Sequence, residues 1–297
     1  LLDHAIRDYE STYGPLGHES PSVAGADLYA PPPLPPCLGP GKPDEKAALI
    51  MSLVENLNVE VGFERSFKVL QKTLLADRFL LGFKRNTIRQ KPNESIMHVC
   101  RQIHMPDDFL VAFYEKLPEA NIVLFGFEES ERGSLYKAYL EFGGRFEQVI
   151  KDNPDMPEPF LIHLGFKWDT ADNSKRAMAR YTCFPSFTVE NMLERLSDVF
   201  YGQEYRGPYE ITESVINLAS NRIGHDRFLY LEVEEEGNPR RSFDINMYRA
   251  NIRMEELYAL LMKVCRHYDI SYEEFGTMYE PVSYTHLRAH ETSLHLV

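Results

Sequence analysis

Basic side chains recur at matching places in several short segments that are typical of strands. They are Lys84, Lys137, Lys167 and Arg180, with Arg78 as a further candidate. Cations that converge repel one another and lose solvation unless anions face them. A bound polyanion such as a diphosphate would supply that charge, and Lys and Arg would also stabilise a leaving group on which charge develops. Pairing with internal carboxylates is the alternative that the sequence leaves open, and the candidates are Glu128, Glu141, Glu232 and Glu234.

Aromatic and acidic side chains fall on the same predicted strand face as the basic ones. The tyrosines are Tyr139, Tyr230 and Tyr248. Their π-faces would stabilise a cation or an allyl group. Glu128 or Asp244 would take a proton from a nucleophilic acceptor. Together, these residue types suit the departure of an anion, the shielding of a cation and the removal of a proton.

The elements that would position these groups form a repeat. Four similar stretches, each aromatic or aliphatic as in a strand, occupy 80–84, 124–128, 163–167 and 230–234. Turn residues follow the last three at 129–133, 169–173 and 235–239, and second strands follow at 135–142, 176–184 and 242–248. We therefore predict antiparallel hairpins, and we expect the turn of the first hairpin near 85–90.

Amphipathic helices separate the predicted hairpins. Apolar residues recur with helical spacing at 50–57, 96–103, 110–117, 192–200, 211–218 and 254–261. The third unit has a single short helix, near 146–150. The last helical pair spans 254–268 and 271–279. The chain thus predicts a repeated helix–helix–hairpin order.

Side-chain alternation along the strands predicts one apolar and one polar face. Helices would cover the apolar face. Lys84, Lys137, Lys167 and Arg180 would share the polar face with the three tyrosines. A sheet of about ten strands tends to curl, and closure removes its edges. We predict a mixed α/β fold, an antiparallel barrel with helices outside and a polar lumen, and an open sheet with a solvated face is the alternative.

Composition narrows the class of protein. The 297 residues are 43% hydrophobic and 26% charged, as in a globular protein with a sizeable core. A net charge of −13 disfavours nucleic acids and anionic membrane faces as partners. The four cysteines are scattered, and no apolar run is long enough for a membrane span. We expect a soluble, cytoplasmic monomer that acts on small molecules.

The two ends are expected to lie outside this domain. Residues 1–44 include a proline- and glycine-rich stretch that reads as a linker or disordered lead-in. Residues 282–292 are similar to the translated read-through of a sequencing adapter, so we treat 282–297 as a non-native tail. The repeat domain then covers 45–281, and its fifth unit is cut short before the hairpin.

Successive helix–helix–strand–strand units around a solvent-filled barrel resemble the ABBA-type (PT-barrel) aromatic prenyltransferases. The resemblance covers about 45–281 in repeat order, and it is carried by the strand pairs 161–168 with 178–181 and 229–233 with 242–248. It implies transfer of a prenyl group from an allylic diphosphate to an aromatic acceptor in the lumen. The single helix of the third unit departs from the pattern.

The resemblance also implies roles for individual residues. Lys84, Lys137, Lys167 and Arg180 would hold the diphosphate, Tyr139, Tyr230 and Tyr248 would shield the cation, and Glu128 would assist the acceptor. No aspartate-rich DDxxD motif or metal-ligand set occurs in the sequence. The sequence is still compatible with a Mg²⁺ ion that bridges the diphosphate. A non-catalytic protein that binds an acidic small molecule or peptide in the same lumen, or a scaffold with a solvated sheet, are the alternatives.

Overall fold

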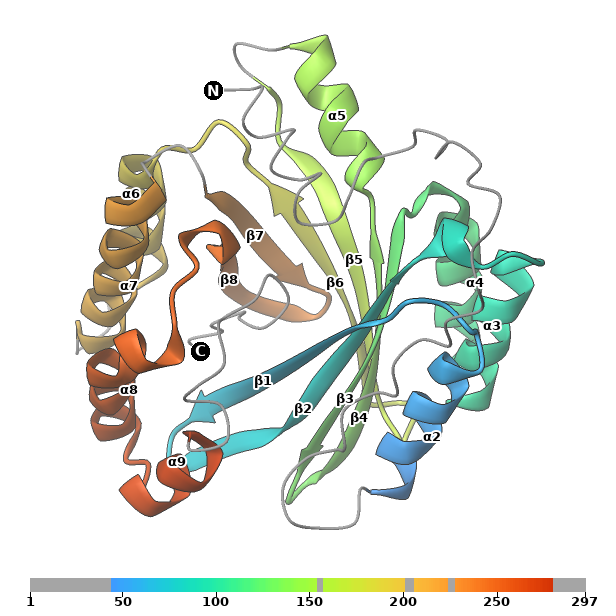
Figure 1. The fold of residues 1–297 in the computed structure, drawn as a ribbon, viewed down its shortest axis with the longest axis horizontal. Helices are drawn as coiled ribbons and strands as arrows, with labels where there is room; N and C mark the ends of the chain where they lie inside the picture. The colour runs from blue at the N-terminus through green and yellow to red at the C-terminus, as the bar shows by residue number, and fades with distance from the viewer. Residues whose placement is uncertain (1–43, 154–156, 201–205, 224–227, 280–297) are drawn as a thin grey trace, which may run out of the picture.

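The computed structural model describes residues 44–153, 157–200, 206–223 and 228–279. Its centre is an eight-stranded antiparallel sheet in which every strand pairs with its neighbours in chain order (Figure 1). The strands are β1 (Gly62–Leu70), β2 (Thr73–Lys84), β3 (Ile122–Ser130), β4 (Gly133–Glu141), β5 (Phe160–Asp169), β6 (Arg176–Cys183), β7 (Leu229–Glu235) and β8 (Asn238–Asn246).

Helices connect the hairpins along the chain. They are α2 (Glu45–Glu55), α3 (Pro92–Gln102), α4 (Asp107–Lys116), α5 (Gly143–Asp152), α6 (Val189–Val199), α7 (Gly207–Ile223), α8 (Met254–Tyr268) and α9 (Tyr272–Tyr279). Short 3₁₀ turns occur at Arg85–Thr87, Leu117–Glu119 and Tyr248–Ala250. Local signals set several helix starts: Asp44 accepts a hydrogen bond from the Lys46 amide, and Thr188 and Asn191 form a capping box.

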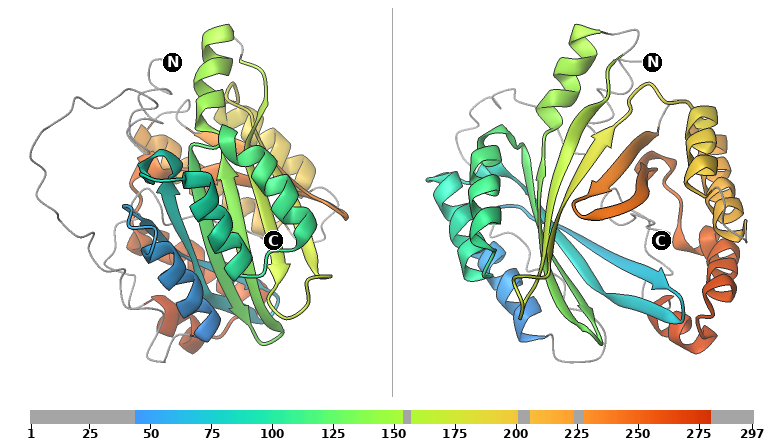
Figure 2. Two further views of the ribbon diagram at one scale, coloured as in Figure 1. Left: turned by 90° about the vertical axis from the view of Figure 1, so that its right-hand side faces the viewer. Right: turned by 180° about the vertical axis from the view of Figure 1, so that it is seen from behind.

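The sheet curls into a half-barrel with helices on its outside (Figures 1 and 2). One hydrophobic cluster joins α2, α3 and α4 to the outer faces of β2–β5, and a second joins α6–α9 to β7 and β8. Within the described residues, β1 and β8 do not pair with each other. The predicted mixed α/β fold of antiparallel hairpins with outer helices is confirmed, and the sheet is curled rather than flat.

The first hairpin differs from our expectation. Leu70 pairs with Thr73, so the turn falls at Gln71 and Lys72 and precedes the 80–84 stretch. Lys72 has a φ of 58°, which suits a tight turn between two strands. Residues 85–87 instead form a 3₁₀ turn. The sequence did not predict β1, because its basic and acidic side chains interrupt the alternation of apolar residues.

The third unit has one helix, as predicted, and this leaves part of the sheet uncovered. Phe146 and Ile150 of α5 pack on Phe160, Cys183 and Leu231 at one end of the sheet. The outer face of β6 carries Arg176 and Arg180, and both are exposed. The polarity of β6 is therefore the reverse of that of the strands that have two helices behind them.

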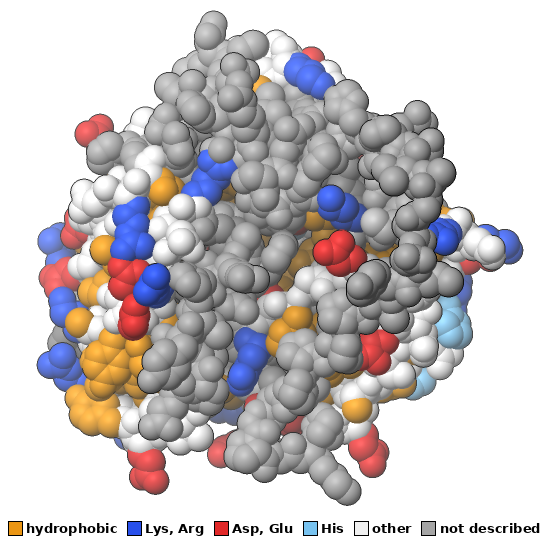
Figure 3. Space-filling model, viewed as in Figure 1, with side chains coloured by type: hydrophobic (Ala, Val, Ile, Leu, Met, Phe, Trp, Pro, Cys, Tyr) orange, Lys and Arg blue, Asp and Glu red, His pale blue; other side chains and the backbone are white. Residues whose placement is uncertain are grey.

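The helical layer continues past β8 to the β1–β2 hairpin. The Lys72 amide donates to the carbonyl of Tyr268 at the end of α8, and the Leu74 amide donates to Glu274 of α9. The rings of Tyr258 and Tyr279 contact each other at a tilt of 57°, with centroids 5.2 Å apart, and tie α8 to α9. Hydrophobic surface gathers over these two helices (Figure 3). No helix within the described residues is long and apolar enough to cross a bilayer.

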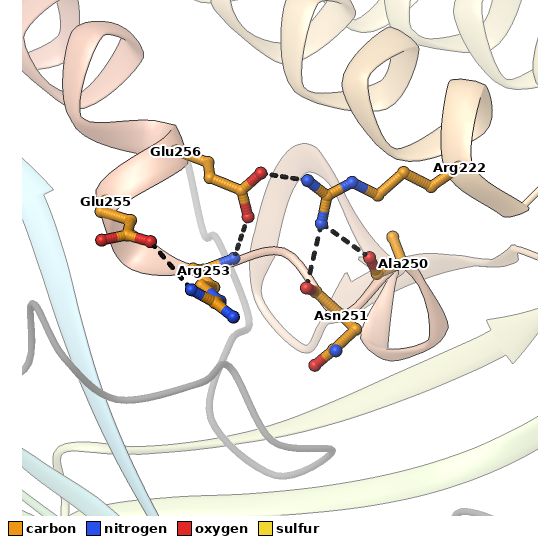
Figure 4. Close-up of polar contacts among 6 residues, drawn as sticks. All are labelled: Arg222, Ala250, Asn251, Arg253, Glu255 and Glu256. Carbon is orange, nitrogen blue, oxygen red and sulfur yellow. Dashed lines mark hydrogen bonds and ion pairs between the residues drawn. The ribbon is translucent and has the colours of Figure 1, made fainter.

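Arg222 at the end of α7 clamps the loop that leads into α8 (Figure 4). Its guanidinium donates to the carbonyls of Ala250 and Asn251 at 3.2 and 3.1 Å, and it pairs with Glu256. Glu256 also accepts from the Arg253 amide at 2.8 Å. One side chain therefore satisfies carbonyls of a loop in which Asn251 has a φ of 44°.

We expect Arg222→Ala to lower the free energy of unfolding by about 1–2 kcal/mol, because two carbonyls and a carboxylate lose a charged donor. Denaturant unfolding measures this change. The matched control is Arg253→Ala, which removes an ion pair with Glu255 whose two side chains are 54% and 55% exposed. That pair is expected to contribute less than about 0.5 kcal/mol. Equal losses in the two variants would contradict the clamp.

Candidate functional site

A cavity of about 240 Å³ opens on the inner face of the half-barrel. Basic, acidic, aromatic and small side chains of all eight strands line it: Lys68, Arg78, Glu128, Lys137, Tyr139, Gly165, Lys167, Ala177, Ala179, Tyr181, Val233, Glu235 and Ser242, among others. Directly opposed residues of paired strands share a face. The register therefore explains the wall, since Arg78 opposes Glu128, Lys137 opposes Lys167, and Tyr181 opposes Val233.

A buried triad forms the deep part of this cavity. The Oε2 atom of Glu128 lies 2.5 Å from Lys137 Nζ and 2.9 Å from Arg78 Nε. All three side chains are less than 10% exposed. Burial alone would raise the pKa of Glu128, but Lys137 and Arg78 outweigh it and hold that pKa at about 2. Glu128 is thus a permanent counter-ion near neutral pH.

Arg78 keeps hydrogen-bonding capacity that the triad does not use. Its Nε is close to Glu128, but the N–H is poorly aligned with the carboxylate, so the contact is an ion pair without a hydrogen bond. Within the described residues, neither Nε nor Nη1 has a hydrogen-bond partner. A buried guanidinium nitrogen without a partner is costly, and an anion in the cavity would remove that cost.

Lys137 has an altered acidity. Burial and the neighbouring Arg78 lower its pKa to about 8, although Glu128 opposes this change. Lys167, opposite Lys137, adds to the lowering. An anion bound among these cations would raise the pKa of Lys137 again. Its positive charge is therefore available below about pH 8, and it is lost above that value in the free protein.

A second ion pair lies nearer the solvent. Lys167 of β5 reaches across β6 to Glu235 of β7, with 2.6 Å between Nζ and Oε2. The intervening inner-face residues are Ala177 and Ala179, whose methyl groups leave room for this bridge. The two side chains are 37% and 29% exposed. With Lys68, the residues that line the cavity include four basic side chains and two acidic ones.

A pair of tyrosines borders the cationic part. The rings of Tyr139 and Tyr181 meet edge to face, with centroids 6.2 Å apart, and their hydroxyls hydrogen-bond. Burial raises the pKa of Tyr139 to about 12. Gly165 makes the arrangement possible, because a Cβ at this position would lie 2.7 Å from the Tyr139 ring. Both phenols are therefore neutral, and both rings lie beside the space that the cations enclose.

His163 and Glu141 lie next to Tyr139 and Tyr181. His163 opposes Glu141 on β4 and Tyr181 on β6. Its Nδ1 is 3.7 Å from Glu141 Oε2, and its ring meets that of Tyr181 at 5.7 Å. Burial lowers the pKa of His163 to about 4, so the imidazole is neutral near pH 7.

Asp244 of β8 belongs to the same inner face. It lies two residues from Ser242, which lines the cavity, and it opposes Leu231. Burial raises the pKa of Asp244 to about 6. Its charge in turn raises the pKa of Tyr181. A carboxylate with a pKa of about 6 is a far better proton acceptor at neutral pH than Glu128 with a pKa of about 2.

The structure brings together part of the predicted site. Lys137, Lys167, Tyr139 and Glu128 line the cavity, and Asp244 shares its face. Lys84 is on the predicted face but opposes Ile122 at the far end of β2, roughly 20 Å along the strand from Arg78. It does not line the cavity.

Three other predicted residues are placed elsewhere. Arg180 opposes Leu164 and Glu234 on the outer face, where the described residues of the third unit form no second helix to cover that part of β6. Tyr230 is fully buried in the helix-side cluster, stacked between Phe187 and Phe243. Tyr248 follows β8 in a 3₁₀ turn, outside the sheet, and its side chain lies outside the described part of the structure. We expected all three in the lumen, and this placement of Arg180 and Tyr230 is wrong.

Sequence reasoning missed Lys68, Tyr181 and Glu235. Lys68 lies on β1, a strand that the apolar pattern did not reveal. Tyr181 follows Arg180, so the expectation that Arg180 faces the lumen places Tyr181 on the helix-facing side. The small residues of β5 and β6 were the available signal, because Gly165, Ala177 and Ala179 lie at neighbouring register positions and leave space above the sheet. Within the described residues, no group of His, Cys, Asp and Glu side chains is arranged to hold a metal ion.

Comparison with solved structures shows a likeness of arrangement. No protein-family model matches the chain, and no curated protein matches its sequence significantly. The solved structure of a 6-dimethylallyl tryptophan synthase superposes with a TM-score of 0.49 and 12% sequence identity, over 76% of this chain and 75% of that chain. A likeness of this size bears on neither substrate nor activity, so the function has to be argued from the cavity itself.

Proposed function

We propose that the cavity binds an allylic diphosphate and transfers its prenyl group to an aromatic acceptor, as in the ABBA-type prenyltransferases. The observation that carries the proposal is Arg78, a guanidinium less than 10% exposed whose Nε and Nη1 lack hydrogen-bond partners among the described residues. It faces a space shared with Lys137 and Lys167. A diphosphate has the charge and the oxygen atoms to satisfy such a cluster.

The chemistry follows from the two parts of the cavity. The C–O bond of the diphosphate breaks heterolytically, and the leaving diphosphate keeps the electron pair beside Arg78, Lys137 and Lys167. The allyl cation forms next to the Tyr139 ring, whose π-face stabilises it. An electron-rich ring of the acceptor then attacks the cation and forms the new C–C bond. The ring finally loses a proton.

Asp244 is our candidate for taking that proton. Its pKa of about 6 leaves it ionised near neutral pH yet basic enough to accept a proton from the cationic ring. Glu128, the other carboxylate predicted for this role, stays paired with Arg78 and Lys137. We assign Glu128 to holding the two cations in place rather than to proton transfer.

Ligand binding and product formation test the proposal in two stages. Dimethylallyl or geranyl diphosphate should raise the melting temperature of the protein, and mass spectrometry should detect prenylated products in a panel of phenols and indoles, with and without Mg²⁺. Binding of diphosphates without any product across the panel would favour the alternative function, a protein that binds an acidic small molecule. The absence of binding by every diphosphate would refute both.

A further inference from the structure

Lys137 is the most deeply buried amine among the described residues that line the cavity. Its side chain is 9% exposed, compared with 37% for Lys167. Among the described residues its Nζ has a single hydrogen-bond acceptor, Glu128, at 2.5 Å. An ammonium group carries three N–H groups and is strongly hydrated in water, so burial disfavours the charged form. Lys137 is therefore poorly solvated as an ammonium, although it keeps a carboxylate beside it.

Burial and a neighbouring cation activate this amine. The pKa of Lys137 is lowered to about 8, and Arg78 is the cation that contributes most. Roughly one amine in ten is then unprotonated at pH 7, compared with fewer than about one in a thousand for an ordinary lysine. An unprotonated lysine amine attacks carbonyl carbons, and proteins activate such lysines by desolvation or by an adjacent cation. Both conditions are met at Lys137.

Glu128 suits the product of such an attack. A protonated imine carries one positive charge, as the ammonium does, but it has one N–H group instead of three. The hydrogen bond from Lys137 to Glu128 is the one that the imine nitrogen would keep. Glu128 stays ionised, because its pKa is held at about 2. The carboxylate would therefore stabilise the protonated imine as it stabilises the ammonium.

Arg78 would hold an anionic group of the same ligand. Arg78 Nε and Lys137 Nζ lie against the same oxygen of Glu128, at 2.9 and 2.5 Å, so the two nitrogens are neighbours. Arg78 is 9% exposed, and its Nε and Nη1 have no hydrogen-bond partner among the described residues. Lys167 opposes Lys137 on the next strand. A phosphate close to a carbonyl group in the same small molecule would reach Arg78 while the carbonyl lies at Lys137.

We propose that Lys137 is a covalent binding site for a small phosphorylated aldehyde, which it holds as a protonated imine. The Nζ atom attacks the carbonyl carbon and forms a C–N bond, and the carbonyl oxygen leaves as water with two protons from the nitrogen. The third proton stays on the imine nitrogen, so the net charge is unchanged and no oxidant or reductant takes part. This activity goes beyond prenyl transfer, because it needs neither an allyl group nor an aromatic acceptor.

Reductive trapping on the full chain tests the proposal. The probe is glycolaldehyde phosphate, and glycolaldehyde is the control without the anionic group. Sodium cyanoborohydride reduces each imine to a stable amine, and peptide mass spectrometry identifies the labelled lysine. Glycolaldehyde phosphate should label Lys137 at least roughly tenfold faster than Lys84, which lies outside the cavity, and at least roughly tenfold faster than glycolaldehyde labels Lys137. Excess inorganic diphosphate should slow the labelling of Lys137 and leave that of Lys84 unchanged.

Arg78→Gln separates the anion site from the amine. Arg78 also lowers the pKa of Lys137, so both probes should react more slowly, but glycolaldehyde phosphate should lose at least roughly tenfold more than glycolaldehyde. The matched control Arg180→Gln removes a guanidinium from the outer face of β6 and should leave both rates unchanged. Equal losses for the two probes in Arg78→Gln would contradict the role of Arg78 as the anion site.

The decisive comparison uses the unchanged protein and depends on no variant. Equal labelling of Lys137 and Lys84, or equal labelling of Lys137 by the two probes, would overturn the inference. Either result together with binding of allylic diphosphates would leave the proposed function intact. Preferential labelling of Lys137 by glycolaldehyde phosphate, in a protein that binds no allylic diphosphate, would uphold the inference and refute prenyl transfer.

Discussion

Replacing Lys137 and Lys167 together by alanine is expected to weaken the binding of an allylic diphosphate at least roughly 100-fold. Each ammonium would donate a charge-assisted hydrogen bond to the ligand, and such a bond is worth about 1.5–3 kcal/mol. Two of them correspond to a factor of roughly 100 or more in the dissociation constant. Calorimetric titration with dimethylallyl diphosphate at about 0.15 M salt measures the loss, since longer-range charge effects are then largely screened.

The chain offers a matched control for this double variant. The double variant Lys84→Ala/Arg180→Ala also removes two positive charges. However, Lys84 lies at the far end of β2, and Arg180 lies on the outer face of β6. We expect its affinity to stay within about threefold of the original, because screened charges outside the cavity contribute little. Similar losses in the two double variants would show that net charge, and not the cavity, controls binding.

The double variant should also keep its fold. After the loss of Lys137, Glu128 still has Arg78 at 2.9 Å. After the loss of Lys167, Glu235 is 29% exposed and can be hydrated. The thermal transition of the ligand-free protein checks this point. A large drop in melting temperature together with the loss of binding would leave Arg78→Lys as the cleaner variant, since it keeps the charge and removes the planar fork that suits a diphosphate.

Asp244→Asn is expected to lower the rate of product formation by about 10²–10³ while the affinity for the diphosphate is unchanged. The amide has nearly the same shape as the carboxylate, but it does not accept a proton. Steady-state rates with the best acceptor measure the change. The matched control is Glu234→Gln, an exposed position opposite Arg180 on the outer face, which should leave the rate unaffected.

The pH profile provides a second readout. Asp244 has a pKa of about 6 in the folded protein, so the rate should fall as the pH drops through about 6, where the carboxylate takes up a proton. Diphosphate affinity should fall as the pH rises through about 8, where free Lys137 loses its proton. Asp244→Asn should remove the acidic limb of the profile and keep the alkaline one. An acidic limb that persists in the variant would exclude Asp244 as its source.

Asp244→Asn should lower the rate of product formation but raise the stability of the folded protein at neutral pH. The folded-state pKa of Asp244 is raised from 3.8 to about 6, so the folded protein favours the neutral acid. The stability that this group contributes is therefore present below pH 3.8 and is lost as the pH rises through about 6. At pH 7, Asp244→Asn should melt at a higher temperature than the original protein. A protein that is more stable and less active identifies the carboxylate as functional rather than structural.

The helices and hairpins followed from local sequence. Residues 254–261 and 192–200 repeat their apolar side chains with helical spacing, and the structure has α8 (Met254–Tyr268) and α6 (Val189–Val199) there. The turn at 130–133 and the β3–β4 hairpin also lie where predicted. These features depend on interactions between residues a few positions apart, so the periods of 3.6 and 2 are sufficient to find them. The sequence likewise predicted Lys137, Lys167, Tyr139 and Glu128 as neighbours, because their strands alternate clearly.

Only the tertiary structure decided which face of β6 and β7 is the inner one. On β6 both faces carry mixed side chains, and a shift of one position exchanges the two faces of a strand completely. The missing second helix of the third unit leaves Arg180 in solvent and turns Tyr181 inward, while α6 and α7 bury Tyr230. The choice between ion pairs and a ligand was also beyond the sequence, because it depends on angles between atoms of distant strands. Glu128 forms an ion pair with Lys137, whereas the buried Nε and Nη1 atoms of Arg78 have no hydrogen-bond partner among the described residues.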